Sequence, residues 1–231
     1  VNQAAARFGA HTGTAYDFAP MFAPLKPILS SADLPLCHLE VPLAPSRGQI
    51  SSYPSFGAPR ELPAGIVSAG YRGCSTASNH SLDKGLAGIY ATLDTFDALG
   101  LGHAGTARTT REAATPRIYD VKGVDVAHLS YAYGFNGIPL PADAPWAANQ
   151  IDPDRVLADA HTARAAGAGL VVVSLHWGTE GQPSPDGQQQ ALAPVLAASP
   201  DVDLVVGQHA PVVQPIERIG DRIVVFGRGN Q

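Results

Sequence analysis

Residues 170–175, Leu-Val-Val-Val-Ser-Leu, form an almost continuous apolar run between two segments with helical patterns. A half-exposed strand alternates apolar with polar residues, whereas a strand covered on both faces is apolar throughout. Helices are expected on either side of this run, over residues 153–166, with Asp152 and Pro153 as N-cap and first residue, and over residues 187–198. The alternation of buried strand and helix predicts an α/β protein.

The rest of the chain continues this alternation. A helix is expected over residues 86–99, because Leu86, Ile89, Leu93, Phe96 and Leu99 recur every three or four residues. Further strands are expected in short apolar segments bounded by turn residues: 33–39, 66–77, 124–133, 203–206 and the two arms of a hairpin at 216–219 and 223–226. Two proline-rich loops, 42–63 and 136–149, are long enough to cover an active site.

The composition is that of a globular protein, and it excludes two classes of partner. The chain has 231 residues, enough for one large domain or two small ones, with 45% hydrophobic and 15% charged residues. Its net charge is −5 and its Lys and Arg residues are scattered, so a nucleic-acid surface is not expected. No run approaches 18 consecutive apolar residues, as a membrane span requires.

The chain has two cysteines, Cys37 and Cys74, and they are not spaced as a thiolate zinc site. Each lies in an apolar segment, so two buried thiols are expected. A disulfide between them requires neighbouring strands and an oxidising compartment. Since the sequence starts at Val1 without an evident first strand, we expect a trimmed N-terminus, and no export signal is visible.

Polar side chains that can bind metals follow several expected strands. They are Glu40, Asn79, His176 and His209, each placed where an apolar run stops. Open α/β sheets carry their chemistry at this edge. A carboxylate, an amide and imidazoles form a mixed oxygen and nitrogen ligand set that suits Mn, Fe or Zn, and two such ions can hold a phosphate and generate hydroxide.

Other residues near these strand ends have two interpretations each. His80 follows Asn79 and is placed to move a proton. Trp177 either stacks on a substrate or packs in the core, and Glu180 either orients an imidazole or is solvated. Asp83 is a helix cap or a site residue. His38 shares a strand face with Glu40, so it is an extra ligand or, as favoured, a structural histidine.

Five segments together resemble the motifs of a known family. Residues 38–43 resemble Asn-Leu-Glu-x-Pro-Leu, and residues 78–85 resemble Asn-Asn-His-x-x-Asp-x-Gly. Residues 176–180 match His-Trp-Gly-x-Glu, residues 207–217 resemble Gly-His-His-Pro-His-Val-x-Gln-x-x-Glu, and residues 227–230 resemble Ser-Leu-Gly-Asn. The chain is thereby identified as similar to the CapA (PgsA-like) poly-γ-glutamate capsule synthesis family of the calcineurin-like metallophosphoesterase superfamily.

The resemblance implies one domain over residues 1–231, a four-layer α/β/β/α sandwich of the metallophosphoesterase type, with a dinuclear metal site. It places Glu40 at a metal-bridging acid, and Asn79, His176 and His209 at further ligands. His80 takes the position of the imidazole that protonates the leaving group. Trp177 and Glu180 are assigned to substrate binding.

The sequence also departs from the family pattern. The family opens with a Gly-Asp strand that nothing before Tyr16 supplies, so the first strand and the C-terminal end of the domain are expected to be missing. Gln208 and Pro211 stand where the family has histidines, and His38 stands where it has asparagine. Proline offers a metal no ligand atom, so a depleted dinuclear site is expected.

Three functions remain open on this basis. The first is a metal-dependent, phosphoesterase-like hydrolase of capsule polymer metabolism, located outside the cytoplasm, either at the cell envelope or secreted. Its substrate would be a polyanionic polymer, a peptide or a phosphoester, and it could belong to a membrane-associated capsule synthesis complex. The second is a degenerate member that binds polymer or a partner without catalysis. The third is a metal-independent acid–base enzyme, such as a peptide epimerase.

Overall fold

A mixed six-stranded sheet forms one half of the molecule in the computed structural model, which describes residues 10–12 and 15–229. The strand order is β10-β11-β9-β8-β7-β6. The central strands run parallel, and the two edge strands β6 and β10 are antiparallel to their neighbours. Their bounds are β6 Arg117–Val121, β7 Val124–Ala132, β8 Leu170–Trp177, β9 Leu204–His209, β10 Ile216–Ile219 and β11 Arg222–Val225.

A smaller parallel sheet lies against the first. It has the order β3-β4-β5, with bounds Leu36–His38, Gly73–Ser75 and Gly102–Ala104. Strands β4 and β5 contact β7, so the two sheets face each other. A separate hairpin pairs β1 (Ala10–Thr12) with β2 (Ala15–Asp17).

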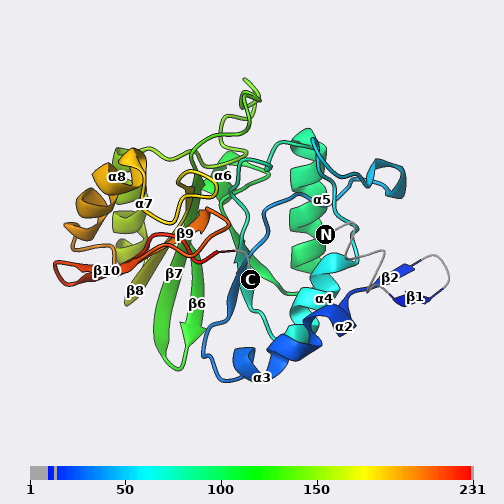
Figure 1. Cartoon of the computed structure of the whole chain (residues 1–231), viewed down its shortest axis with the longest axis horizontal. Helices are drawn as coiled ribbons and strands as arrows, with labels where there is room; N and C mark the ends of the chain where they lie inside the picture. The colour runs from blue at the N-terminus through cyan, green and yellow to red at the C-terminus, as the bar shows by residue number, and fades with distance from the viewer. Residues whose placement is uncertain (1–9, 13–14, 230–231) are drawn as a thin grey trace.

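Helices cover the outer face of each sheet (Figure 1). Helices α7 (Pro153–Ala165) and α8 (Gly187–Ala197) pack on the six-stranded sheet. Helices α4 (Leu62–Ala69) and α5 (Gly85–Ala98) share a core with the three-stranded sheet. The expected α/β/β/α layering is therefore confirmed. Short helices complete the described chain: α2 Ala19–Phe22, η1 Ala23–Leu25, α3 Lys26–Leu29, η2 Arg47–Gln49 and α6 Thr110–Ala113.

Alternation along β8 divides its residues between two environments. Val171, Val173, Leu175 and Trp177 pack into the core beneath α7 and α8. The residues between them, including Ser174 and His176, therefore face the smaller sheet. The space between the sheets thus receives polar side chains, and the strand ends that border it carry the site.

Most sequence-based elements are confirmed, with one correction. The helices expected at 86–99, 153–166 and 187–198 are present, and Asp152 accepts a hydrogen bond from Arg155 N as N-cap. Residues 66–77, expected as a strand, instead contain the end of α4 and the short strand β4. Pro63 lies in the first turn of this helix, and Gly70 ends it with a positive φ of 110° that favours glycine.

The two cysteines form a disulfide, which corrects the expectation of two buried thiols. Cys37 and Cys74 are paired directly across the parallel strands β3 and β4, and their sulfur atoms are bonded. Each cysteine precedes a residue that faces the site, His38 and Ser75. The cross-link therefore fixes the two strands next to the residues that support the site.

Within the described residues, no helix combines the length and the apolar character needed to cross a membrane.

Removing the disulfide is expected to destabilise the protein. The bond closes a loop between residues 37 positions apart, so its loss in a Cys37→Ala/Cys74→Ala variant should lower the free energy of unfolding by about 2–4 kcal/mol. Urea unfolding of the oxidised protein measures this, with the reduced wild type as a matched control. Two titratable thiols in the oxidised native protein would contradict the assignment.

Candidate functional site

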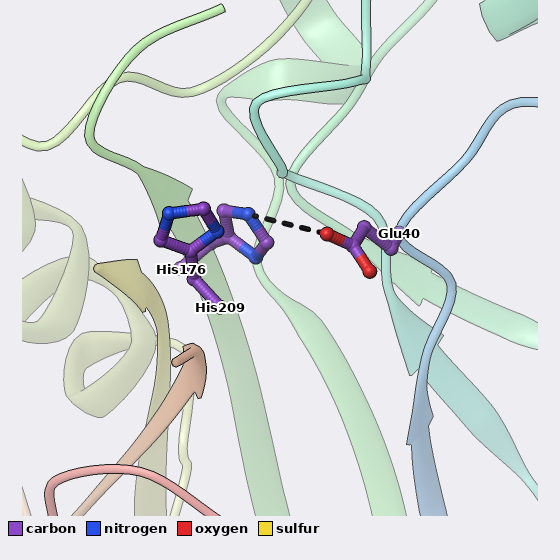
Figure 2. Close-up of side chains that lie close together, drawn as sticks. All are labelled: Glu40, His176 and His209. Carbon is purple, nitrogen blue, oxygen red and sulfur yellow. Dashed lines mark ion pairs between the residues drawn. The ribbon is translucent and has the colours of Figure 1, made fainter. Parts of the chain in front are cut away.

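Three of the predicted metal ligands meet between the two sheets. Glu40 follows β3, His176 lies near the end of β8, and His209 is the last residue of β9. Each offers one ligand atom, and these atoms all lie within 4.8 Å of one another. Figure 2 shows both imidazoles on the same side of the Glu40 carboxylate, whose Oε1 is 3.9 Å from His176 Nε2. The carboxyl ends of strands from both sheets thus converge as the sequence predicted.

Asn79 adds a fourth ligand atom to this group. Its Oδ1 lies 2.8 Å from Nε2 of His176. This is the distance of a hydrogen bond, so the amide oxygen and the imidazole nitrogen face each other. Both atom types are ligands of first-row divalent metals.

Burial keeps the imidazoles of the site uncharged. It lowers the pKa of His176, an effect that the neighbouring His38 and His209 reinforce, and it also lowers the pKa of His209. Burial raises the pKa of Glu40, although His80 opposes that change. A neutral imidazole keeps the lone pair that a metal requires, so these nitrogen atoms suit a divalent cation at neutral pH.

His209 shows two further features that fit a ligand position. Its φ of 89° is positive, which is uncommon for a residue other than glycine and concentrates at functional sites. Its buried Nδ1 has no hydrogen-bond partner in the described part of the chain. A buried polar atom without a partner is costly, and a bound cation would satisfy it. The donor set, the spacing and this nitrogen together fit a divalent metal.

A series of hydrogen bonds holds Nδ1 of His176, the ring nitrogen that does not face Asn79. This nitrogen lies 3.0 Å from Nε2 of His38, and Nδ1 of His38 lies 2.8 Å from Oγ of Ser75. The Ser75 hydroxyl also reaches the carbonyl oxygen of Cys37 at 3.4 Å. Burial lowers the pKa of His38 to about 3, so this imidazole is also neutral.

The hydrogen bonds of this series can all point in either of two directions. When His176 donates Nε2–H to Asn79, its Nδ1 accepts from His38, which in turn accepts from Ser75. When Nε2 of His176 binds a cation, Nδ1–H donates to His38, His38 donates to Ser75, and Ser75 donates to Cys37 O. His38 therefore fits the interpretation as a structural histidine, which holds the proposed ligand His176 in place by a hydrogen bond.

His80 and Asp83 form a dyad beside this cluster. Nδ1 of His80 lies 2.8 Å from Oδ2 of Asp83, and the same oxygen accepts a hydrogen bond of 2.7 Å from Phe56 N. The Phe56 ring packs edge-on against the imidazole, with centroids 4.7 Å apart. Asp83 does not cap α5, whose N-cap is Lys84, so it orients His80 instead. With Nδ1 bound to the carboxylate, Nε2 is available for proton transfer.

Two further residues of this site, Tyr133 and Asn136, are not among those predicted from the sequence. Oδ1 of Asn136 accepts from Nδ2 of Asn79 at 3.1 Å, which orients the ligand oxygen toward His176. The Tyr133 ring stacks on His176 and contacts His209, with centroids 6.2 and 5.0 Å apart. Asn136 has a positive φ of 52°, but its position in a proline-rich loop carries no motif that would have identified it.

The two residues assigned to substrate binding have different outcomes. Trp177 is completely buried, donates Nε1–H to Phe226 O at 2.9 Å and stacks on the Phe226 ring. It therefore packs the core and does not face a ligand, which corrects the substrate-binding interpretation. Glu180 is exposed, and its charge raises the pKa of Tyr133 and of Glu40. Its role in substrate binding stays a prediction.

Gln208 and Pro211, which replace family histidines, lie at the end of β9 and just beyond it. The Gln208 side chain is buried, and its Oε1 lacks a partner among the described residues. Asn230, the last residue of the closing motif, lies outside the described residues. In the part of the chain that the structure describes, Glu40, His176 and His209 form the one cluster of at least three His, Cys, Asp or Glu ligands.

Comparison with known proteins relates this site to a family. Residues 1–231 match the family described as bacterial capsule synthesis protein PGA_cap. The chain is 27% identical over 178 residues to the capsule biosynthesis protein CapA of Bacillus anthracis, covering 76% of this chain and 43% of the relative. It is 28% identical over 158 residues to the PGA biosynthesis protein CapA of Bacillus subtilis (strain 168), covering 68% and 41%. The chain thus spans less than half the length of these curated relatives.

Solved structures share the fold. The sulfate thiohydrolase SoxB of Thermus thermophilus superposes with a TM-score of 0.52 at 15% identity, over 92% of this chain and 37% of that one. The NAD nucleotidase NadN of Haemophilus influenzae gives a TM-score of 0.52 at 11% identity, over 88% and 38%. At these identities the likeness shows the fold alone, which is of the calcineurin-like metallophosphoesterase type.

Removing the support behind His176 is expected to weaken metal binding. In His38→Ala, Nδ1–H of His176 loses its acceptor, and the dissociation constant for Mn²⁺ or Zn²⁺ should rise about 10- to 100-fold. His38→Gln, whose carbonyl oxygen can accept the same hydrogen, should recover much of this loss. Isothermal titration calorimetry measures the constants, and His161→Ala, at an exposed histidine paired with Asp201, is the control. Equal affinity in His38→Ala and the wild type would contradict the supporting role.

Proposed function

The chain belongs to the bacterial capsule synthesis family PGA_cap, and from that premise we propose that it is a metal-dependent, phosphoesterase-like hydrolase of capsule polymer metabolism. One observation carries the proposal: the ligand atoms of Glu40, His176 and His209 lie within 4.8 Å of one another, and Asn79 Oδ1 lies 2.8 Å from the His176 nitrogen. These four residues would hold a divalent cation, Mn, Fe or Zn. A single ion is proposed, because Pro211 and Gln208 replace two family histidines.

The residues of the site divide the chemistry between them. When bound, a divalent ion supplies Lewis-acid polarisation of a phosphoryl oxygen and lowers the pKa of water. His80 would donate a proton from Nε2 to the leaving-group oxygen, while Asp83 holds the opposite nitrogen and stabilises the imidazolium. The Phe56 ring and backbone fix the dyad, and Asn136 fixes the Asn79 amide. The proton donor is thus oriented by residues that are not among the four proposed ligands.

We place the protein outside the cytoplasm, at the cell envelope. The Cys37–Cys74 disulfide supports this location, because disulfides persist in oxidising compartments. The names of the two curated relatives, both concerned with capsule or PGA biosynthesis, point the same way. A polyanionic polymer, a peptide or a phosphoester remains the proposed substrate, and a membrane-associated capsule synthesis complex remains the proposed assembly.

Two other functions each have one supporting observation. A binding member without catalysis is favoured by Gln208 and Pro211, which remove two histidines from the family set. A metal-independent acid–base enzyme is favoured by the His80–Asp83 dyad, which is complete without an ion. The experiment below separates all three.

His80→Ala is expected to lower turnover of an aryl phosphate about 10²- to 10⁴-fold while leaving metal content unchanged, because the imidazole transfers a proton and is not one of the four ligands. Metal content is measured by inductively coupled plasma mass spectrometry, and turnover with and without Mn²⁺. His161→Ala is the matched control.

The outcomes are distinct. Metal binding with activity that depends on His80 supports the proposed hydrolase. Neither metal nor turnover would support the binding member, and turnover that survives chelation would support the acid–base enzyme. Either of the last two results contradicts the proposal.

A further inference from the structure

A pocket of about 310 Å³ adjoins the candidate metal centre. One wall is apolar and comes from the short helices before β3 and from α4: Met21, Phe22, Leu25, Leu62 and Ile66. The opposite wall is polar and comes from the strand ends: His38, Glu40, Gln208, His209 and Arg228. Because Glu40 and His209 line this pocket and are also proposed ligands, a molecule bound there would reach the centre.

Arg228 is the one arginine or lysine among the described residues that line this pocket. It forms no ion pair with any residue that the structure describes, and burial lowers its pKa. Tyr71 is the one neighbouring group that favours its charged form. The guanidinium belongs to a residue that lines the same pocket as Glu40 and His209. A partly buried guanidinium without a carboxylate is unfavourable unless something else balances it.

The backbone holds Arg228 in place against the sheet. Its amide donates to Gly207 O at 3.2 Å, and it bridges to Val213. Just before it, the carbonyl oxygen of Phe226 accepts hydrogen bonds from the buried side chains of Trp177 and Gln189. A Cβ at Gly207 would lie 1.7 Å from that same oxygen, so glycine is required for this close approach. Arg228 therefore sits on a fixed segment.

Gln208 supplies a second unsatisfied group on the polar wall. Its side chain is 6% exposed, and its Oε1 has no donor among the described residues. Buried amide oxygens normally have a partner. Gln208 and Arg228, one neutral and one cationic, thus line the same pocket, and the described residues supply neither Gln208 Oε1 with a donor nor Arg228 with an ion pair.

We propose that this pocket is the binding site for an amphiphilic anion, in which Arg228 holds a phosphate or carboxylate and the apolar wall holds an attached hydrocarbon segment. Guanidinium groups bind both anions through paired hydrogen bonds. Met21, Phe22 and Leu25 provide the surface against which an aliphatic segment buries. The assignment deepens the proposed function by naming its substrate class, while binding of the anion itself does not require the metal.

NMR titration in the presence of EDTA tests the anion contact without the metal. The probes are hexyl phosphate, hexanoate, inorganic phosphate and hexanol. Arg228→Met keeps most of the aliphatic stem. It should weaken the binding of the preferred hexyl anion about 10-fold or more and leave the affinity for hexanol unchanged. Arg228→Lys should retain most of the affinity. Arg218→Met, at an exposed arginine paired with Asp221, is the matched control.

The apolar wall has its own test. Leu25 is 36% exposed. Leu25→Ser should weaken the binding of hexyl phosphate about 4-fold for each methylene that loses its contact, and should leave the binding of inorganic phosphate unchanged. Preference for hexyl phosphate over hexanoate, or the reverse, identifies the anion.

Three results would overturn the proposal. They are equal binding of the hexyl anions by Arg228→Met and wild type, equal binding of hexanol and the hexyl anions by wild type, and loss of binding in both Arg228 variants together with a lower Tm. Because every titration is done without metal, these results are independent of whether the proposed hydrolase activity exists.

Discussion

The site depends on imidazoles that remain uncharged in the space between the two sheets. His176 and His38 face each other there at 3.0 Å, a distance at which two imidazolium ions would repel strongly. Burial lowers the pKa of both groups, and hydrogen bonds to Asn79 and Ser75 satisfy their outer nitrogen atoms. His128 is buried in the same way and forms a hydrogen bond with Ser174. Neutral, hydrogen-bonded imidazoles let the two sheets pack closely and also leave a nitrogen lone pair for a cation.

Three kinds of structure then contribute to one location. The ends of β8 and β9 provide His176 and His209, and Glu40 directly follows β3. The loop after β4 provides Asn79 and the His80–Asp83 dyad, and the two proline-rich loops provide Phe56 and Asn136. Strand pairing fixes the two histidines, and the disulfide fixes β3 to β4 beside Glu40. The amphiphilic pocket is lined by Glu40 and His209. Anion binding and cation coordination would thus share these two side chains, whereas proton transfer would use His80.

The sequence predicted what depends on periodicity and on strand ends. The buried strand at 170–175 and the flanking helices follow from apolar patterns, and convergence of Glu40, Asn79, His176 and His209 follows from the parallel sheet. Contacts between distant segments could not be predicted. The disulfide depends on the register in which β3 pairs with β4, which the sequence does not give. The edge strand β6 has the sequence Arg-Ile-Tyr-Asp-Val, whose polar residues hide the apolar pattern of a strand. Asn136 belongs to no motif, Arg228 stands at the leucine position of the closing motif, and the positions of both depend on the packing of loops.

We propose that four side chains hold one divalent cation, and anomalous diffraction from a crystal grown with Zn²⁺ would locate that ion. One strong peak is expected at about 2.0–2.2 Å from oxygen atoms of Glu40 and Asn79 and nitrogen atoms of His176 and His209. The absence of a peak between these residues, or a peak bound to other side chains, would contradict it.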